Sequence, residues 1–413
     1  MKELLFLAHR IPYPPMKGDK IRSYHVLKHL TRDYLVHLGT FIDDAEDWRH
    51  VQAMQALCGD TCFVHLRPLA ARLRSLAAFA RGEPLTLPYY RSTRLQLWVD
   101  ALLARGAVRR VFVFSSSMAQ YVERAPDLSI RRVLDFVDMD SDKWRQYAPT
   151  RPWPLSWVFA REAKTLLQYE RRCASHFDAS VFVSEAEARL FRTQVPESAA
   201  RVNCIENGVD TEYFSPAREY PNPYGSGERA IIFTGAMDYW ANVDAVSWFA
   251  ADVYPRVRSA LPQAVFYIVG SRPSTAVRQL ATRDGVRVTG TVPDVRPYLA
   301  HAHVAVAPLR IARGVQNKVL EAMAMACPVL ASAQAADGLR LDASLRAIVC
   351  TDASEMAGRA VELLTGGDRL NLGERGREWV LHHYSWSTNL SRIGQLLEGE
   401  AAPVRAAVLA SGA

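Results

Sequence analysis

The sequence predicts an α/β protein built of two doubly wound, Rossmann-like domains that face a cleft. Its 413 residues exceed the size of one ordinary hydrophobic core and favour two domains. Hydrophobic residues make up 49% and charged residues 23% of the chain, which is typical of a globular protein. Short apolar runs followed by helical patterns recur along its whole length, as parallel βα units require.

Six apolar runs mark the strands of the first domain, which we expect to span residues 1–215. The first run, Leu4 to Ala8, is too short for a signal peptide and is interpreted as a buried strand. The other candidates are Val36 to Phe41, Cys62 to Leu66, Val111 to Phe114, Val133 to Val137 and Ser180 to Val183.

A second set of short runs rich in Val and Ile predicts another sheet over residues 228–384. A Pro-, Gly- and polar-rich stretch, residues 214–227, sustains neither helical nor strand periodicity and is expected to be the linker. The Ala-rich tail, residues 401–413, is expected to be mobile. The strand candidates are Ala230 to Thr234, Val265 to Val269, Val286 to Thr289, Val304 to Pro308, Val329 to Ser332 and Ala347 to Val349.

The charge balance points to an anionic partner. A net charge of +7 and a pI of about 9.1 suit a nucleotide, a phospholipid surface, a pyrophosphate lipid or nucleic acid. No nucleic-acid-binding motif is recognisable, so nucleic acid is not expected. Six scattered cysteines without a framework spacing favour reduced thiols in the cytoplasm, and no metal site is expected.

The segment from Val304 to Leu330 carries the most chemical information, because it reads as strand, glycine-containing loop, helix and strand. Gly314 would let the backbone approach a ligand, and the helix start after it favours a diphosphate. Lys318 adds positive charge, and Glu321 follows one turn later, where it can accept hydrogen bonds from ribose hydroxyls. Alternatively, Lys318 and Glu321 form an ordinary surface pair worth about 0.2–0.5 kcal/mol.

Further candidates follow other predicted strands. Gly235 opens the loop after the first strand of the second domain, where it can pass close to a donor. In the first domain, Asp138 and Asp140 spell the metal-binding Asp-x-Asp motif of GT-A glycosyltransferases, although the two-sheet layout argues against that fold. The Ser115 to Ser117 run could contact a sugar through Ser116 or cap a helix.

Residues 67–81 form a basic, apolar segment at helical spacing. Such a helix can lie on an anionic bilayer with Leu73, Leu76 and Phe79 inward and its arginines at the headgroups. It can equally be an amphipathic helix packed on its own domain. The sequence leaves both interpretations open.

The run from Lys318 to Leu330 resembles the donor-site helix and strand of retaining GT-B glycosyltransferases of the glycosyl transferases group 1 (family 4-like) type. Glu321 matches the second glutamate of that family's pair, while Arg313 stands where the first is expected. The stretch Arg313 to Ala324 resembles the exosortase (PEP-CTERM) system-associated sugar transferases. Residues 385–400 are similar to the segment that crosses back to complete the first domain of this fold.

The resemblance implies transfer of a hexosyl-type sugar from a nucleotide diphosphate donor, expected to be UDP-linked, to a lipid-linked exopolysaccharide intermediate with retention of configuration. It implies no cofactor and no required metal, and a cytoplasmic protein that can bind the inner face of the plasma membrane. The implied catalytic residues are Lys318, Glu321, Arg313 and Asp138. The implied donor-binding residues are Gly18, Gly235, Asn242, Gly314, Val315, Gln316, Asn317, Lys318 and Glu321. The implied acceptor-side residues are Asp138, Asp140 and Ser116.

Two other functions remain compatible with the sequence. A GT-B-fold sugar-nucleotide epimerase would process the donor without an acceptor. A catalytically inactive donor-binding partner of a polysaccharide assembly complex would fit the replacement of the first glutamate by Arg313.

Overall fold

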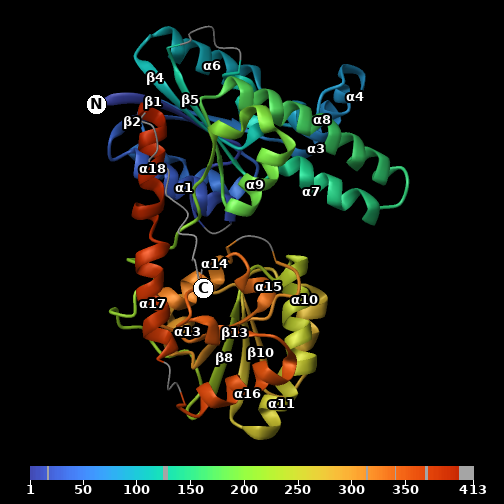
Figure 1. Cartoon of the computed structure of the whole chain (residues 1–413), viewed down its shortest axis with the longest axis vertical. Helices are drawn as coiled ribbons and strands as arrows, with labels where there is room; N and C mark the ends of the chain where they lie inside the picture. The colour runs from blue at the N-terminus through green and yellow to red at the C-terminus, as the bar shows by residue number, and fades with distance from the viewer. Residues whose placement is uncertain (16–17, 124–128, 313–314, 340, 368–370, 400–413) are drawn as a thin grey trace, which may run out of the picture. The chain divides into compact units, whose positions relative to one another are not determined.

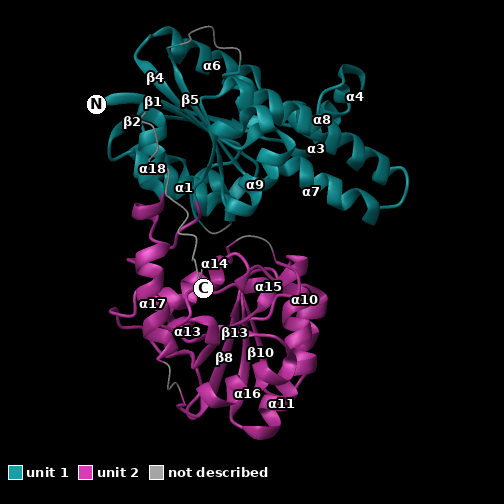
Figure 2. Ribbon diagram, in the orientation of Figure 1, with its two compact units in different colours: residues 1–205, 390–413 teal, residues 206–389 magenta. Residues whose placement is uncertain are grey.

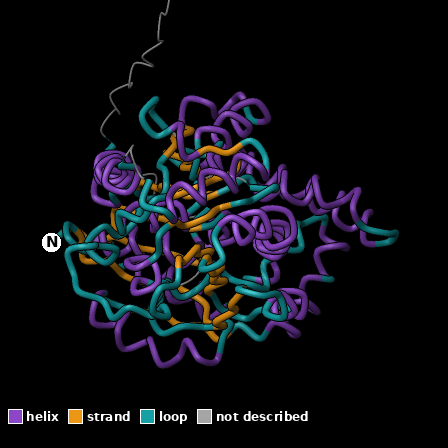
Figure 3. Tube along the Cα trace, turned by 90° about the horizontal axis from the view of Figure 1, so that it is seen from below, coloured by secondary structure: helices purple, strands orange, loops and turns teal. Residues whose placement is uncertain are grey.

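The computed structural model describes residues 1–15, 18–123, 129–312, 315–339, 341–367 and 371–399 (Figure 1). The chain forms two compact units: unit 1 comprises Met1–Ile205 and the segment from Leu390 onward, and unit 2 comprises Glu206–Asn389 (Figure 2). Each unit holds a parallel sheet, and helices lie outside the strands (Figure 3). The predicted α/β fold class with two doubly wound domains is confirmed.

Across its described residues, unit 1 has a seven-stranded sheet in the order β3-β2-β1-β4-β5-β6-β7. All neighbouring strands are parallel. Leu4 to Ala8 of β1 and Val111 to Phe114 of β4 are apolar and buried, so both faces of the sheet must be covered by helices. The strands are β1 Lys2–Ala8, β2 Tyr34–Ile42, β3 Thr61–His65, β4 Val108–Phe114, β5 Arg131–Val137, β6 Ala179–Phe182 and β7 Val202–Cys204.

The helices of unit 1 follow these strands as crossover connections. They are α1 Gly18–Leu30, α2 Val51–Leu57, α3 Pro68–Ser75, α4 Ala77–Arg81, α5 Thr86–Tyr89, α6 Thr93–Ala104, α7 Asp140–Tyr147, α8 Leu155–His176 and α9 Glu185–Gln194, with 3₁₀ turns at η1 Ala45–His50, η2 Ser116–Tyr121, η3 Ala148–Thr150 and η4 Pro196–Arg201.

Across its own described residues, unit 2 has a six-stranded parallel sheet in the order β10-β9-β8-β11-β12-β13. Its strands are short and β-branched, and they lie in one continuous hydrophobic core. The strands are β8 Arg229–Thr234, β9 Ala264–Val269, β10 Val286–Gly290, β11 Val304–Ala307, β12 Val329–Ser332 and β13 Val349–Cys350.

The helices of unit 2 again connect successive strands. They are α10 Trp240–Trp248, α11 Tyr254–Ala260, α12 Thr275–Leu280, α13 Arg296–His301, α14 Asn317–Ala324, α15 Ala333–Ala336, α16 Ala353–Leu364 and α17 Leu372–His383, with a π turn η5 at Phe249–Val253 and a 3₁₀ turn η6 at Arg346–Ile348. The last helix, α18 Trp386–Glu398, begins in unit 2 and ends in unit 1. Within the described ranges, no helix is both long and apolar enough to cross a bilayer.

Two strands differ from the sequence-based expectation. The expected strand Ala347 to Val349 is shifted, because residues up to Ile348 form the turn η6 and the strand pairing involves Val349 and Cys350. The edge strand β7 was not predicted, since three residues are too short to show a period of two.

The units divide at residues 205 and 389 rather than at the expected 215 and 384. The segment after Ile205 packs on unit 2: Val209 donates its N–H to the Tyr384 carbonyl at 2.8 Å and forms a parallel bridge with Ser385. The stretch expected to be the linker, residues 214–227, therefore lies inside unit 2. The segment expected to return to the first domain, residues 385–400, contains α18.

The end of α18 is tied to the sheet of unit 1 by Glu398. Its carboxylate accepts hydrogen bonds from Arg110 Nε at 2.7 Å, Tyr34 Oη at 2.7 Å and Lys2 Nζ at 2.8 Å. These bonds, those from Arg110 foremost, lower the pKa of Glu398 to about 2. The C-terminal helix is thereby held by charge as well as by packing.

Strand order and chain order diverge at one position in each sheet. In unit 1 the chain runs from β1 outward through β2 and β3, and returns on the other side of β1 as β4. In unit 2 it runs from β8 through β9 and β10, and returns beside β8 as β11. In doubly wound sheets the loops at such a switch point separate, and ligands bind at the carboxyl ends of the two strands.

Candidate functional site

The switch point of unit 2 brings together three predicted donor-binding residues. Gly235 directly follows β8, Asn242 lies on α10, and Lys318 lies on α14, which follows β11. Lys318 Nζ donates a hydrogen bond to Asn242 Oδ1 at 2.5 Å, and Asn242 Nδ2 donates one to the Ala236 carbonyl at 2.9 Å. Asn242 therefore links the loop after β8 to the ammonium group on α14.

Close packing and positive φ angles explain why glycine follows both β8 and β9. Gly235 has φ +155°, and a Cβ built there would lie 2.8 Å from Asn242 Nδ2 and 3.6 Å from Lys318 Nζ. Gly270, which follows β9, has φ +159°, and its Cβ would lie 1.6 Å from the Gly235 carbonyl oxygen. Gly270 was missed by sequence reasoning, although its position directly after an apolar run was the signal that identified Gly235.

Burial disfavours the charged forms of both ionisable side chains at this site, Lys318 and Glu321. Lys318 Nζ lies 4.5 Å from the centroid of the buried Phe233 ring. Burial lowers the pKa of Lys318 to about 8, against the opposing charge of Glu321. Burial also raises the pKa of Glu321 to about 7, against the charge of Lys318. An arriving diphosphate would stabilise the charged form of Lys318, because an anion close by raises the pKa of an ammonium group.

The start of α14 offers further polar groups. The first backbone N–H groups of a helix have no intrahelical acceptor and are available to an anion. Asn317 begins α14, and its buried Oδ1 has no hydrogen-bond partner among the described residues. Val315 and Gln316, in the loop before it, are partly buried. Arg313 and Gly314 were predicted as site residues and lie outside the described part of the chain.

A basic side chain from the neighbouring loop was also missed. The loop after β8 carries no Arg or Lys, but Arg272, in the loop after β9, pairs with Asp238 at 2.9 Å. Arg272 has φ +50°, a conformation that an arginine adopts rarely. Met237, which stands between Gly235 and Asp238, is buried and donates its N–H to the Ser271 carbonyl. The loop after β8 and the loop after β9 are therefore joined by a backbone hydrogen bond and by the ion pair of Arg272 with Asp238.

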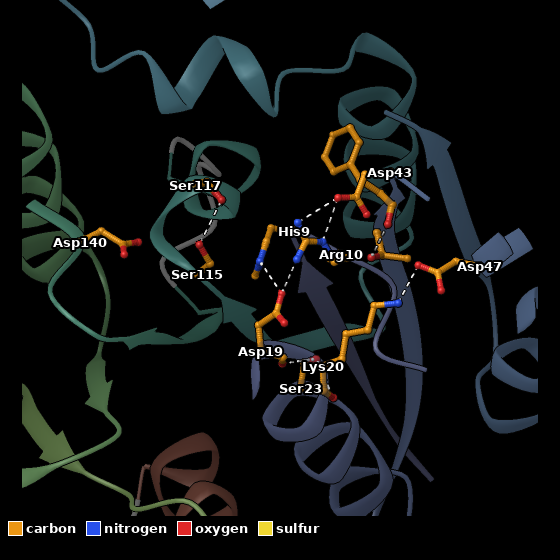
Figure 4. Close-up of polar contacts among 12 residues, drawn as sticks. His9, Arg10, Asp19, Lys20, Ser23, Asp43, Asp47, Ser115, Ser117 and Asp140 are labelled. Atoms are coloured by element: carbon orange, nitrogen blue, oxygen red, sulfur yellow. Dashed lines mark hydrogen bonds and ion pairs between the residues drawn. The ribbon is translucent and has the colours of Figure 1, made fainter. Parts of the chain in front are cut away.

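The switch point of unit 1 holds a network of ion pairs at the end of β1 (Figure 4). Asp19, on the first turn of α1, lies 3.5 Å from His9 Nε2 and accepts a hydrogen bond from Arg10 Nη1 at 2.8 Å. Arg10 also donates to Asp43 at 3.0 Å. His9 and Arg10 lower the pKa of Asp19 well below its usual range, so this carboxylate stays ionised.

Aromatic rings fix the orientation of His9. The imidazole stacks on Phe114 at 5.9 Å with an interplanar angle of 5°, and Tyr90 meets it edge-on at 5.8 Å. Its Nδ1 is buried and has no hydrogen-bond partner within the described ranges. Sequence reasoning missed His9 and Asp19 as site residues, although a His-Arg pair directly after the first strand marks the carboxyl edge of a sheet.

Backbone strain gathers at the ends of the two neighbouring strands, β4 and β5. Ser115 has φ +77° and Val137 has φ +68°, which is costly for a β-branched residue. Ser115 Oγ lies 3.1 Å from Ser117 Oγ, whereas the predicted acceptor-side Ser116 is buried in η2. The serine run does not cap η2 through a side chain. Asp135, on β5, forms a fully buried ion pair with Arg22 at 2.8 Å.

Asp138 and Asp140 share one cation. Lys143 Nζ donates to Asp138 Oδ2 at 2.8 Å and to Asp140 Oδ1 at 3.2 Å. These two carboxylates raise the pKa of Lys143 against the effect of burial, so the ammonium stays charged. The Asp-x-Asp motif is thus partly neutralised by one lysine at the start of α7. Among the described residues, no group of three or more His, Cys, Asp or Glu side chains could hold a metal ion.

Gly18 begins α1 and is exposed. A Cβ built at this position meets no atom within 4 Å. The protein therefore imposes no requirement for glycine here, in contrast to Gly235 and Gly270.

A cavity of about 1130 Å³ lies elsewhere in unit 1, between α6 and α8. Arg91, Gln120, Tyr169 and Arg172 are among its lining residues. None of the predicted site residues lines it, so the strand ends rather than cavity size identify the candidate site.

The chain is similar to known glycosyltransferases. Residues 228–366 match the family described as Glycosyl transferases group 1. A GDP-mannose-dependent alpha-(1-6)-phosphatidylinositol monomannoside mannosyltransferase of Mycolicibacterium smegmatis is 26% identical over 279 residues, which are 62% of this chain and 70% of that protein.

Solved structures resemble nearly the whole chain. Sucrose-phosphate synthase from Thermosynechococcus elongatus matches with a TM-score of 0.65 and 17% identity, over 97% of this chain and 99% of that one. Anabaena HepE, solved in complex with UDP and glucose, matches with a TM-score of 0.61 and 13% identity, over 97% of this chain and 100% of that one. The chain has the GT-B fold, its residues 228–366 match the Glycosyl transferases group 1 family, and it is a nucleotide-sugar-dependent glycosyltransferase.

Proposed function

We propose that the protein transfers a hexosyl-type sugar from a UDP-sugar to a lipid-linked exopolysaccharide intermediate, with retention of anomeric configuration. The hydrogen-bonded pair of Lys318 and Asn242, which lies beside Gly235, carries this proposal. It places an ammonium group and a glycine backbone at the switch point of unit 2, where a diphosphate can be held. The subgroup is that of the exosortase-associated sugar transferases, as residues 313–324 suggest.

Each donor-side residue has a distinct task in this proposal. Lys318 and the N-terminal amides of α14 stabilise the charge that develops on the departing diphosphate. Glu321, one turn further along α14, accepts hydrogen bonds from the ribose hydroxyls. Asn242 orients the Lys318 ammonium, to which it is bonded at 2.5 Å. Arg313 and Gly314 complete the donor loop in the sequence, and Arg313 is assigned to the diphosphate because a guanidinium binds phosphate oxygens in pairs.

Retention follows from attack by the acceptor on the same face that the diphosphate leaves. Such a reaction requires charge stabilisation of the leaving group and no nucleophile from the enzyme. Lys318 supplies that stabilisation from a partly buried position, where a charge interacts more strongly than in water. The configuration of the product, read by NMR from the anomeric coupling, separates retention from inversion.

The acceptor is assigned to the polar edge of unit 1. Asp138, Asp140 and Ser116 belong to this edge, and we add His9 with its partner Asp19. Asp138 is paired with Lys143. In this proposal an acceptor hydroxyl displaces the Lys143 ammonium from Asp138, and the Asp138 carboxylate then takes the proton of that hydroxyl as a general base. A cytoplasmic enzyme that acts on a lipid-linked acceptor works at the inner face of the plasma membrane.

GDP-mannose is a second candidate donor, favoured by the GDP-mannose-dependent mannosyltransferases that resemble this chain. A panel of UDP- and GDP-sugars is to be screened for thermal stabilisation of the purified protein, since a ligand that binds the folded state raises its melting temperature. The best ligand is then incubated with and without a lipid-linked acceptor. Transfer only with acceptor supports the proposal, whereas conversion of the donor alone would identify an epimerase.

A further inference from the structure

We infer that unit 1 carries a docking surface for an anionic phospholipid bilayer, formed by α3, α4 and the first turns of α8. We call this docking surface the aromatic–leucine surface. Membrane docking through it is separate from the donor and acceptor chemistry and does not depend on which sugar is transferred. Its apolar members are Leu69, Leu73, Leu76, Phe79, Trp153, Leu155 and Trp157, each of which exposes between 36% and 82% of its area.

The helices α3 and α4 bury small residues and expose large apolar ones, which is the reverse of an ordinary surface helix. Their buried residues are the small Ala71, Ser75 and Ala78, while Leu73 and Leu76 point into solvent. A helix packed on its own domain buries its large apolar side chains instead. The alternative of an amphipathic helix packed inward is therefore wrong for these leucines.

Tryptophans from the α7–α8 hairpin extend the same surface. The Phe79 and Trp157 rings stack at 5.9 Å with an interplanar angle of 9°. Trp153 precedes α8 and is 82% exposed. Figure 1 shows α3, α4 and the α7–α8 hairpin projecting from the same side of unit 1. Tryptophan is the side chain most typical of the bilayer interface, because its ring is apolar and its N–H remains hydrated.

Arg161 joins the two parts into one rigid surface. Its guanidinium lies 4.7 Å from the Phe79 ring centroid. It donates to the Ala78 carbonyl at 2.8 Å and to the Glu83 carbonyl at 3.1 Å. These contacts hold α4 against α8, so the backbone that carries the exposed side chains is in place before a membrane is met.

The charge around the surface selects a bilayer with anionic headgroups. Residues 67–82 contain Arg67, Arg72, Arg74 and Arg81 and no acidic residue. The α7–α8 loop adds Arg151. Glu162, the acidic residue nearest along α8, is buried and accepts hydrogen bonds from the backbone of residues 85 and 86. Basic side chains beside apolar ones are the pattern of a helix lying in the headgroup region of a membrane.

Vesicle binding tests this inference with the full-length protein. Wild-type protein should sediment with vesicles of phosphatidylcholine and phosphatidylglycerol and much less with phosphatidylcholine alone. The double variant Leu73→Glu/Leu76→Glu should bind at least about tenfold more weakly. Arg72→Gln and Arg74→Gln should each weaken binding about fivefold, and high salt should reduce this difference.

The matched control is Leu97→Glu, which introduces the same charge at a leucine of α6 that is 64% exposed and lies outside the surface. It should bind like the wild type, and circular dichroism should show that all variants are folded. Failure of the wild type to bind anionic vesicles, or equal loss of binding by Leu97→Glu, would overturn the inference. So would a wild-type dimer in sedimentation velocity that Leu73→Glu/Leu76→Glu dissociates, since the occupant would then be a second copy of the chain.

Discussion

Lys318 and Asn242 are joined by a 2.5 Å hydrogen bond between the ammonium Nζ and the amide Oδ1. This bond connects the helix after β11 to the helix after β8. These two strands are neighbours at the switch point, where the chain stops adding strands on one side of β8 and continues on the other. The predictions about donor binding follow from this relationship, because it fixes a cation at the point where doubly wound sheets bind ligands.

Donor affinity should depend on pH through Lys318. Its pKa is lowered to about 8 by burial, so the free protein carries the ammonium below pH 8 and loses it above. A diphosphate binds the charged form, and the UDP affinity should therefore fall as the pH rises through about 8. In Lys318→Arg, which does not titrate in this range, the fall should disappear. Calorimetric titrations between pH 6.5 and 9.5 measure both profiles, and identical profiles would contradict the assignment.

Gly18, Gly235 and Gly270, which lie at strand and helix ends, should respond unequally to substitution by alanine. Gly270→Ala should lower the free energy of unfolding by about 2–4 kcal/mol, because its Cβ would lie 1.6 Å from the Gly235 carbonyl oxygen. Gly235→Ala should lower the free energy of unfolding because of its φ of +155°, and should also weaken UDP binding, since its Cβ would lie 2.8 Å from Asn242 Nδ2. Gly18→Ala meets no atom and should leave stability unchanged. Urea unfolding and UDP titration separate the cases, and equal destabilisation by all three would count against the geometry.

His9 should act on the acceptor and leave donor binding intact. The variant His9→Phe keeps a ring against Phe114 and Tyr90 but removes both nitrogens. We expect kcat/KM for the acceptor to fall at least about tenfold, the cost of one lost hydrogen bond to a charged or polar partner. UDP affinity should stay at the wild-type value. His65→Phe, at an imidazole that stacks on Trp48, is the matched control. A parallel loss of UDP affinity in His9→Phe would assign the residue to another role.

The sequence predicted the architecture well because apolar runs report burial directly. The runs at Leu4 to Ala8 and Val265 to Val269 became central, fully buried strands. Where an element is short, as in β7, or begins after a 3₁₀ turn, as in β13, the periodic signal is too brief to place it. The end of unit 1 at Ile205 was equally hidden, because the bridge between Val209 and Ser385 joins residues far apart in the chain.

The site was predictable where one segment carries it and unpredictable where two segments meet. Lys318 and Glu321 share a helix, so their common face follows from a period of 3.6 residues. Arg272 and the buried pair of Arg22 with Asp135 depend on contacts between distant segments. A periodicity argument cannot supply such contacts. The outward-facing leucines of α3 show the same limit, since a helical pattern does not say which face meets the domain.

Calorimetric titration of UDP into Lys318→Met tests the central claim most directly. The substitution keeps most of the side-chain length and removes the ammonium, and Lys28→Met, at an exposed lysine of α1, is the control. Loss of a charge-assisted bond worth about 1.5–3 kcal/mol should weaken UDP binding by roughly 10- to 100-fold, with the fold unchanged. UDP affinity equal to that of the wild type and of Lys28→Met would contradict a donor site at the switch point of unit 2.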